Sequence, residues 1–195
     1  MPLVIAAATS GSTTIQATDA VTATITLPSA PTTLVGKTTP SFTTTIGVGN
    51  ATPSASGAGI TFPATQSAST DANTLDDYEE GTWTPTVTAG SGSYTTVTTQ
   101  TGSYVKIGKQ VTLTWYFIVS NKGTGATSAI ISNLPFASNA SVTNYYVGVG
   151  AETSSGLMQQ AGMYSTTTFQ ITRYDGVDPI MITHGNHGSI TYFTA

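Results

Sequence analysis

Hydrophobic and polar residues alternate most clearly over residues 110–119, and this pattern predicts a β-strand. Because successive side chains of a strand point to opposite sides, one face would carry five apolar residues. These are Val111, Leu113, Trp115, Phe117 and Val119. The other face would carry Thr112, Thr114, Tyr116 and Ile118. Since both faces have bulk, we expect the strand to lie between its own core and either another sheet or a neighbouring subunit.

Further strands are predicted in the second half of the chain. One begins at Thr82, and the others cover residues 103–107, 129–133, 144–150, 166–174, 179–183 and 189–193. Gly185, Asn186 and Gly188 are expected to form a hairpin turn between the last two. About eight short strands in ~114 residues are typical of a jelly roll or a related sandwich. The predicted fold class is therefore all-β, with a jelly-roll-like β-sandwich head.

The first part of the chain has a different pattern. The first 70 residues carry two charged side chains, Asp19 and Lys37, and only Phe42 and Phe62 of the aromatic residues precede Tyr78. With apolar burial contributing ~25 cal/mol per Å², so few large apolar groups cannot build a core within one copy. We therefore predict two domains, an extended arm or shaft over residues 1–75 and a head over residues 76–195.

A short repeat suggests how the arm is built. Residues 25–28 read Ile-Thr-Leu-Pro, and residues 60–63 read Ile-Thr-Phe-Pro. Repeated short strands with proline and glycine punctuation are typical of an intertwined β shaft, in which each unit buries its apolar face against neighbours. The alternative is a flexible Ser/Thr linker.

Composition narrows the classes of partner. Only 7% of the residues are charged, the net charge is −4, and roughly one residue in five is threonine, which favours strands. Five basic residues cannot neutralise a run of phosphates, so nucleic-acid binding is not expected. No apolar run approaches the ~20 residues of a membrane-spanning helix, and residues 3–8 lack the basic leader of a secretory signal. We expect a protein made in the cytoplasm without membrane insertion.

Four of the nine acidic residues lie together at the boundary between the two parts: Asp76, Asp77, Glu79 and Glu80. Calcium loops place their oxygen ligands at alternate positions around a glycine turn, and glycosidases take their two carboxylates from separate strands. Neither arrangement is present here. The cluster is interpreted as a solvated collar or capping turn, with Lys106 or Lys109 as charge partners.

No catalytic constellation is recognised, so we expect neither an enzyme nor a cofactor. Cysteine is absent, and the twenty glycines form no phosphate-binding fingerprint. His184 and His187 could contribute to a metal site if their loop curled around an ion, but no further ligand is evident. The turn interpretation of residues 185–188 is preferred to the metal site.

Tyrosines are the remaining candidates for binding, because an exposed ring can stack on a sugar and also donate a hydrogen bond. Alternation of Tyr145, Val147 and Val149 predicts that Tyr145 belongs to the core, which leaves Tyr146 on the opposite face. Tyr146 and Tyr164 are therefore the candidate receptor-binding residues.

Three strings together resemble the tail-fibre and related virion proteins of tailed bacteriophages. They are Leu-Asp-Asp-Tyr-Glu-Glu-Gly-Thr-Trp-Thr-Pro at residues 75–85, Gly-Ser-Tyr-Val-Lys-Ile-Gly at residues 102–108 and Leu-Pro-Phe at residues 134–136. Residues 24–36 also look like the threonine-rich repeats of such fibres. The order and spacing of these segments extend the resemblance over most of the chain.

The resemblance implies a homotrimeric component of the virion, attached to other virion proteins through its first half. Its head would contact a bacterial surface glycan. The preferred hypothesis is a short tail fibre. A capsid decoration, cement or head-fibre protein is the alternative, and a small polysaccharide-degrading tailspike is a third hypothesis.

Overall fold

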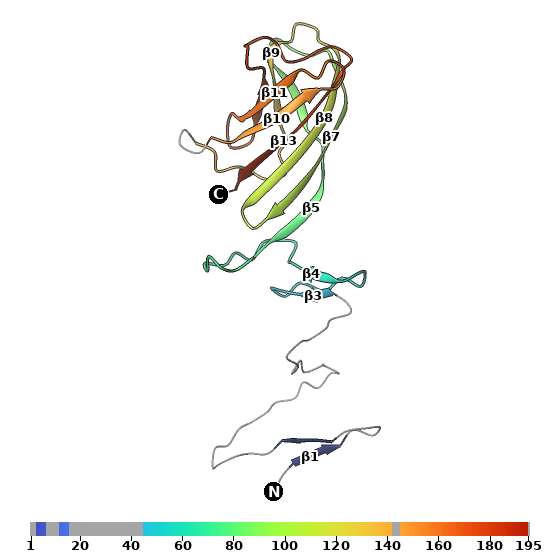
Figure 1. Cartoon of the computed structure of the whole chain (residues 1–195), viewed down its shortest axis with the longest axis vertical. Helices are drawn as coiled ribbons and strands as arrows, with labels where there is room; N and C mark the ends of the chain where they lie inside the picture. The colour runs from blue at the N-terminus through green and yellow to red at the C-terminus, as the bar shows by residue number, and fades with distance from the viewer. Residues whose placement is uncertain (1–2, 7–11, 16–44, 142–144, 195) are drawn as a thin grey trace. The chain divides into compact units, whose positions relative to one another are not determined.

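The computed structural model describes residues 3–6, 12–15, 45–141 and 145–194, and every regular element among them is a β-strand (Figure 1). The predicted all-β class is confirmed for these residues. The chain divides into two units, Met1–Ser41 and Phe42–Ala195, and each is described by itself. In the first unit, β1 (Leu3–Ala6) pairs antiparallel with β2 (Ser12–Ile15). The first copy of the predicted repeat, residues 25–28, lies outside the described residues.

The second unit begins with a small parallel pair of strands, β3 (Thr45–Gly47) and β4 (Gly59–Thr61). The second copy of the repeat starts in β4, where Ile60 lies opposite Ile46. Each strand has three residues, and Ile60 is 56% exposed. Two strands of this length bury too little apolar surface to be stable without further packing.

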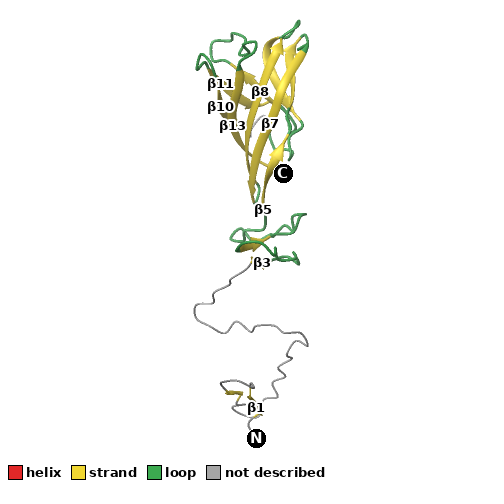
Figure 2. Ribbon diagram, turned by 90° about the vertical axis from the view of Figure 1, so that its right-hand side faces the viewer, coloured by secondary structure: helices red, strands yellow, loops and turns green. Residues whose placement is uncertain are grey.

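Nine strands form one antiparallel sheet, in the order β5-β7-β8-β13-β10-β11-β12-β9-β6 (Figure 2). Their bounds are Tyr78–Trp83 (β5), Thr86–Ser91 (β6), Thr96–Ile107 (β7), Gln110–Asn121 (β8), Ala126–Ser132 (β9), Val147–Glu152 (β10), Met158–Met163 (β11), Phe169–Thr172 (β12) and Gly185–Phe193 (β13). The hairpin of β7 and β8 has the longest strands, with a tight turn at Gly108, whose φ of 54° suits glycine.

The sheet curls so that its two edges approach each other. The edge strands β5 and β6 are consecutive in the chain, and Thr84 and Pro85 connect them. A register shift in β7 between Thr98 and Thr101 lets the Gln100 Oε1 atom accept a hydrogen bond of 3.1 Å from the Val87 N–H group of β6. Pro85 is fully buried and has no N–H to pair, which explains why the strand predicted from Thr82 is divided into two.

The inner face of the curled sheet encloses one hydrophobic core. Its buried residues are Trp83, Val87, Val111, Leu113, Trp115, Phe117, Val119, Ala129, Ile131, Ala161, Met163, Phe169, Ile171, Ile180, Ile190 and Tyr192. All five apolar residues predicted for one face of strand β8 belong to it, each at most 2% exposed. On the other face of β8, Tyr116 and Ile118 are half-buried, whereas Thr114 is exposed.

Two local predictions are wrong, and one strand is missed. Residues 179–183 form no strand, because Ile180 and its neighbours follow an irregular path that includes a φ of 67° at Thr183. Gly185, Asn186 and Gly188 do not form a turn but lie in β13, between β8 and β10 in the middle of the sheet. Strand β11 was not predicted, since its sequence Met-Gln-Gln-Ala-Gly-Met has neither bulky alternation nor β-branched residues.

Candidate functional site

Residues from the strings 75–85, 102–108 and 134–136 meet at one end of the head. Strand β5 pairs with β7, so that Glu79 lies opposite Lys106. Asp77 and Lys106 form a buried ion pair, each 4% exposed. The Lys106 Nζ atom also lies 5.5 Å from the centre of the Phe136 ring. Residues far apart in the sequence therefore form one cluster, which we call the junction cluster: Asp77, Tyr104, Lys106 and Phe136.

Glycines in two of the strings make room for the aromatic residues of the facing strand. Gly81 lies opposite Tyr104, and Gly102 lies opposite Trp83. A Cβ atom at Gly81 would lie 2.9 Å from the Tyr104 ring, and one at Gly102 would lie 2.3 Å from the Trp83 Nε1 atom. The Trp83 indole can thus donate a hydrogen bond of 3.0 Å to the Thr114 carbonyl oxygen. These glycines have a packing role.

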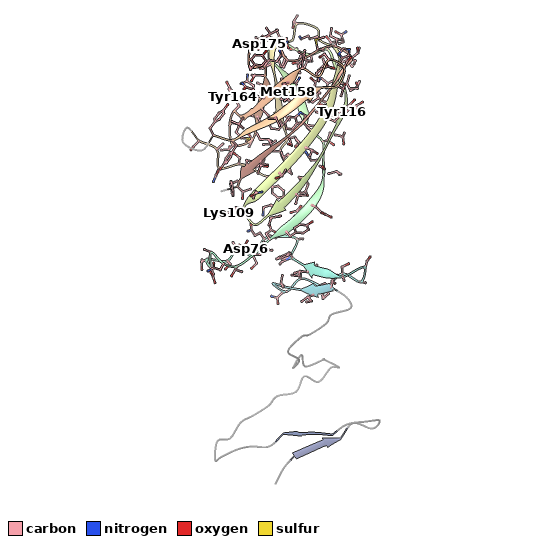
Figure 3. All side chains as sticks on the ribbon, in the orientation of Figure 1. Asp76, Lys109, Tyr116, Met158, Tyr164 and Asp175 are labelled. Carbon is pink, nitrogen blue, oxygen red and sulfur yellow. The ribbon has the colours of Figure 1, made fainter. Side chains whose placement is uncertain are left out.

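Gln66 connects the preceding segment to the junction cluster. Its Oε1 atom accepts a hydrogen bond of 3.3 Å from Lys106, and its Nε2 atom donates one of 3.2 Å to Asp76. The Ser69 N–H group donates to the other carboxylate oxygen of Asp76 at 2.8 Å, and this bond lowers the Asp76 pKa. Figure 3 shows Asp76 near the end of the nine-stranded sheet where Lys109 lies. A hollow of about 480 Å³ lies beside these residues. Sequence reasoning missed Gln66, which has no distinctive neighbours.

The acidic cluster is not solvated throughout, as a solvated collar would be, because Asp77 is buried whereas Glu80 is exposed. Asp77 is buried against Lys106, and the other carboxylates accept hydrogen bonds within the chain. The Tyr104 hydroxyl donates to Glu79 at 2.6 Å, and this bond raises the Tyr104 pKa to about 12. The Tyr78 hydroxyl donates to Glu80 at 2.6 Å, which raises the Tyr78 pKa. Lys106 is the charge partner, whereas Lys109 is exposed at the β7–β8 turn.

The two histidines have separate surroundings. The His184 Nδ1 atom lies 3.0 Å from Glu152 Oε1, whereas His187 lies on the outer face of β13. Burial alone would raise the Glu152 pKa, but hydrogen bonds from Ser155 and the Ser154 N–H group, together with the electrostatic effect of nearby His184, lower it to about 2. Among the described residues, no group of three or more His, Asp or Glu side chains could hold a metal ion.

The predicted orientation of the tyrosine segment is reversed. Tyr146 is half-buried, and its hydroxyl donates a hydrogen bond of 2.5 Å to Asn139. Tyr145 is instead 65% exposed, as are Val147 at 62% and Val149 at 59%. Tyr164 is 68% exposed just beyond the end of β11 (Figure 3). Tyr146 is therefore part of the packing, while its suggested role in receptor binding stays a prediction.

Glycines explain this reversal. The inward positions of β10 are Gly148, Gly150 and Glu152. A Cβ atom at Gly148 would lie 2.7 Å from the Ile190 Cβ atom, and one at Gly150 would lie 3.3 Å from the Trp115 ring. Because side chains from neighbouring strands fill the space beneath β10, its valines point outward.

The outer face of the sheet carries an exposed, uncharged surface. A groove of about 460 Å³ is lined by Thr114, Trp115, Val149, Gly150, Ala151, Met158, His187, Gly188 and Ser189. Beside it, a smaller hollow of about 90 Å³ is lined by Tyr145, Val147, Gln160, Ala161, Gly162, Gln170 and Thr172. Neither lining contains Asp, Glu, Lys or Arg. Such a surface suits a neutral ligand that offers both apolar and hydrogen-bonding groups.

Comparison of the chain with protein-family models, curated proteins and solved structures gives no match in any of the three. Within the described part of the chain there is no helix that is both long and apolar enough to cross a membrane.

Proposed function

We propose that this chain is a structural protein of a tailed-bacteriophage particle, a short homotrimeric tail fibre whose head contacts the host surface. The residue strings 75–85, 102–108 and 134–136 carry the family resemblance. Their convergence in the junction cluster supports the proposal, because it gives the strings one shared structural role at the base of the head.

The observation that carries the proposal is the contrast in burial between the two parts. Among residues 45–75, all of which the structure describes, none is buried. Val48, Ile60 and Leu75 are 36%, 56% and 56% exposed. The head instead encloses sixteen buried hydrophobic residues. Residues 45–75, which have no core of their own, need other chains to cover their apolar side chains, as expected of part of a shaft that attaches to a particle.

The head has features that support the finer assignment of a jelly-roll-like sandwich. Strands β8 and β9 are consecutive in the chain but are separated by four strands in the sheet order, and β12 and β13 are separated by two. Connections that cross between distant strands of a curled antiparallel sheet are typical of Greek-key and jelly-roll heads. In phage fibres such a head would display its outer face to the host.

Labelling of particles tests this function. We expect gold-conjugated antibodies against the head to mark the tail of intact virions, and an excess of purified protein to slow adsorption of those virions to their host. Labels on the capsid faces, with unchanged adsorption, would instead favour a decoration protein. A mock antibody and a heat-unfolded sample of the protein are the matched controls.

A further inference from the structure

The hollow beside Tyr145 combines an exposed aromatic ring with two side-chain amides. Tyr145 precedes β10, while Gln160 lies on β11 and Gln170 on β12, so three adjacent segments contribute to it. The Gln160 Nε2 atom donates a hydrogen bond of 3.1 Å to Thr172 Oγ1, and the Gln170 Nε2 atom donates one of 2.7 Å to Ser128 Oγ. These bonds hold both amides in place. Each amide keeps a carbonyl oxygen and a second N–H with which to bind a ligand.

Gly162 leaves the space in which the ring lies. A Cβ atom at Gly162 would lie 2.3 Å from the Tyr145 hydroxyl oxygen and 3.0 Å from Cζ of the ring. The tyrosine therefore lies across the outer face of β11, where glycine leaves room for it. With 65% of its surface exposed, the ring presents an apolar area next to the polar amides.

We propose that this hollow is a subsite for one neutral pyranose unit of a glycan, formed by Tyr145, Gln160, Gln170 and Thr172; it rests on the proposed function as a host-attachment protein. The C–H face of the sugar packs against the Tyr145 ring, and its hydroxyl groups bond to the two amides and to Thr172. The lining contains no charged residue, so nothing there binds a carboxylate, sulfate or phosphate group. One small subsite gives weak binding, and the three subsites of one homotrimer strengthen it by avidity.

A second copy of this chain is the competing occupant, because Val147 and Val149 extend the apolar area beyond the hollow. The amides favour the sugar. A face of β-branched residues would suffice for packing against another sheet, whereas amides held open beside a ring are suited to hydroxyl groups.

Saturation-transfer NMR on the full chain tests the subsite. The neutral probes are D-glucose, D-galactose, D-mannose and N-acetyl-D-glucosamine, and the charged probes are D-glucuronate and N-acetylneuraminate. We expect saturation of at least one neutral sugar and of neither charged one. Failure of all four neutral sugars, or equal saturation of the charged ones, would overturn the proposal.

Matched variants locate the binding. Y145A removes the ring. G162A displaces it, because the added Cβ atom would lie too close to the hydroxyl end of the Tyr145 side chain. Both substitutions should raise the Kd of the sugar at least about tenfold, or ~1.4 kcal/mol. Y145F keeps the ring and should stay within about threefold of wild type, as should Y174A, which removes a tyrosine that is 83% exposed elsewhere on the head. Equal losses in Y145A and Y174A would contradict the subsite.

Sedimentation of Y145A and adsorption of virions that carry it distinguish failure of the sugar subsite from failure of the proposed function. If Y145A lowers the mass of the purified oligomer in sedimentation and the wild-type protein binds no sugar, this face is an interface between copies and the sugar subsite is wrong. If virions carry the protein on their tails and adsorb normally when made with Y145A, the attachment role stands while the subsite fails. If no virion label appears on the tail, the proposed function itself fails, whatever the sugars show.

Discussion

The ion pair of Asp77 and Lys106 joins β5 to β7 at the base of the head, and both side chains are about 95% removed from solvent. Removing one member of a buried pair leaves the other charge without compensation. We expect K106M to lower the free energy of unfolding by roughly 3–5 kcal/mol, as measured by chemical denaturation of the full chain. K109M is the control, because Lys109 is exposed, and it should change the free energy by less than about 0.5 kcal/mol.

Replacing both members of the pair separates charge from packing. A D77L/K106M variant contains no buried charge at this position, and apolar substitution of a whole pair is often close to neutral. The double variant should therefore be more stable than K106M. A double variant as unstable as K106M would mean that the pair acts through its contacts with Gln66 and Phe136 rather than through charge.

Glu152 gives the head a defined sensitivity to acid. Its pKa is lowered from 4.5 to about 2, so its ionised form stabilises the folded state. That contribution is fully present above pH 4.5 and is lost as the pH falls towards 2. We expect E152Q to have a lower Tm than wild type at pH 6, with the difference shrinking between pH 4.5 and 2. Thermal unfolding followed by circular dichroism measures this, and a difference that does not change with pH would contradict it.

At the scale of single strands, the sequence predicted β8 well and β10 badly, for a physical reason. In β8, bulky apolar residues occupy every inward position, so alternation reveals the buried face. In β10, the inward positions are taken by Gly148 and Gly150 because the Ile190 and Trp115 side chains occupy the space. Glycine carries no hydrophobic signal, so the alternation in the sequence wrongly assigns the outward valines to the core.

The candidate sites were predictable to different degrees. The motif strings contain the residues of the junction cluster but did not predict that they meet, because the burial of Asp77 depends on pairing with a lysine 29 positions away. Gln160 and Gln170 gave no signal, because glutamine is common on exposed strands. The register of β11 against β10 and β12 brings them beside Tyr145, and no local pattern encodes that register.

The glycine pair of the central strands yields a prediction of its own. Gly188 lies opposite both Gly150 and Trp115, and a Cβ atom there would lie 2.4 Å from the Trp115 ring and 2.4 Å from the Val149 carbonyl oxygen. G188A should lower the free energy of unfolding by about 1–3 kcal/mol, since extra volume in a packed core forces side chains and backbone to shift. Chemical denaturation measures this.

The control for G188A is S189A, on the next residue of β13. Ser189 lies on the outer face and lines the groove, so S189A should change the free energy by less than about 0.5 kcal/mol. Equal effects of the two substitutions would mean that the strand tolerates side chains equally on both faces. That result would contradict the close packing of Trp115.

At the scale of the whole chain, the two parts differ in what they need in order to be stable. The head has a core drawn from β5, β6, β8, β9, β11, β12 and β13, whereas residues 45–75 have no buried residue within one copy. We therefore expect the head to be stable within one chain, and residues 45–75 to depend on association for their stability. The difference can be measured on a fragment that contains the head without the arm.

We expect the full chain of 19.9 kDa to sediment as a trimer of about 60 kDa. A fragment of residues 76–195 should keep the β-sheet circular dichroism spectrum and cooperative unfolding of the head, because its core lies within that range. It should dissociate at higher protein concentrations than the full chain, since it lacks the apolar residues of the arm. The I60T variant of the full chain should also weaken association, because Ile60 is 56% exposed within one copy.

The same comparison identifies where the chains associate. If the fragment is as firmly trimeric as the full chain and I60T has no effect, the head holds the copies together and Ile60 takes no part in their association. If the full chain is a monomer at every concentration, the homotrimer is wrong. A fragment that fails to unfold cooperatively would show that the head needs residues before Asp76, and Gln66, which binds both Lys106 and Asp76, would then be the first residue to restore.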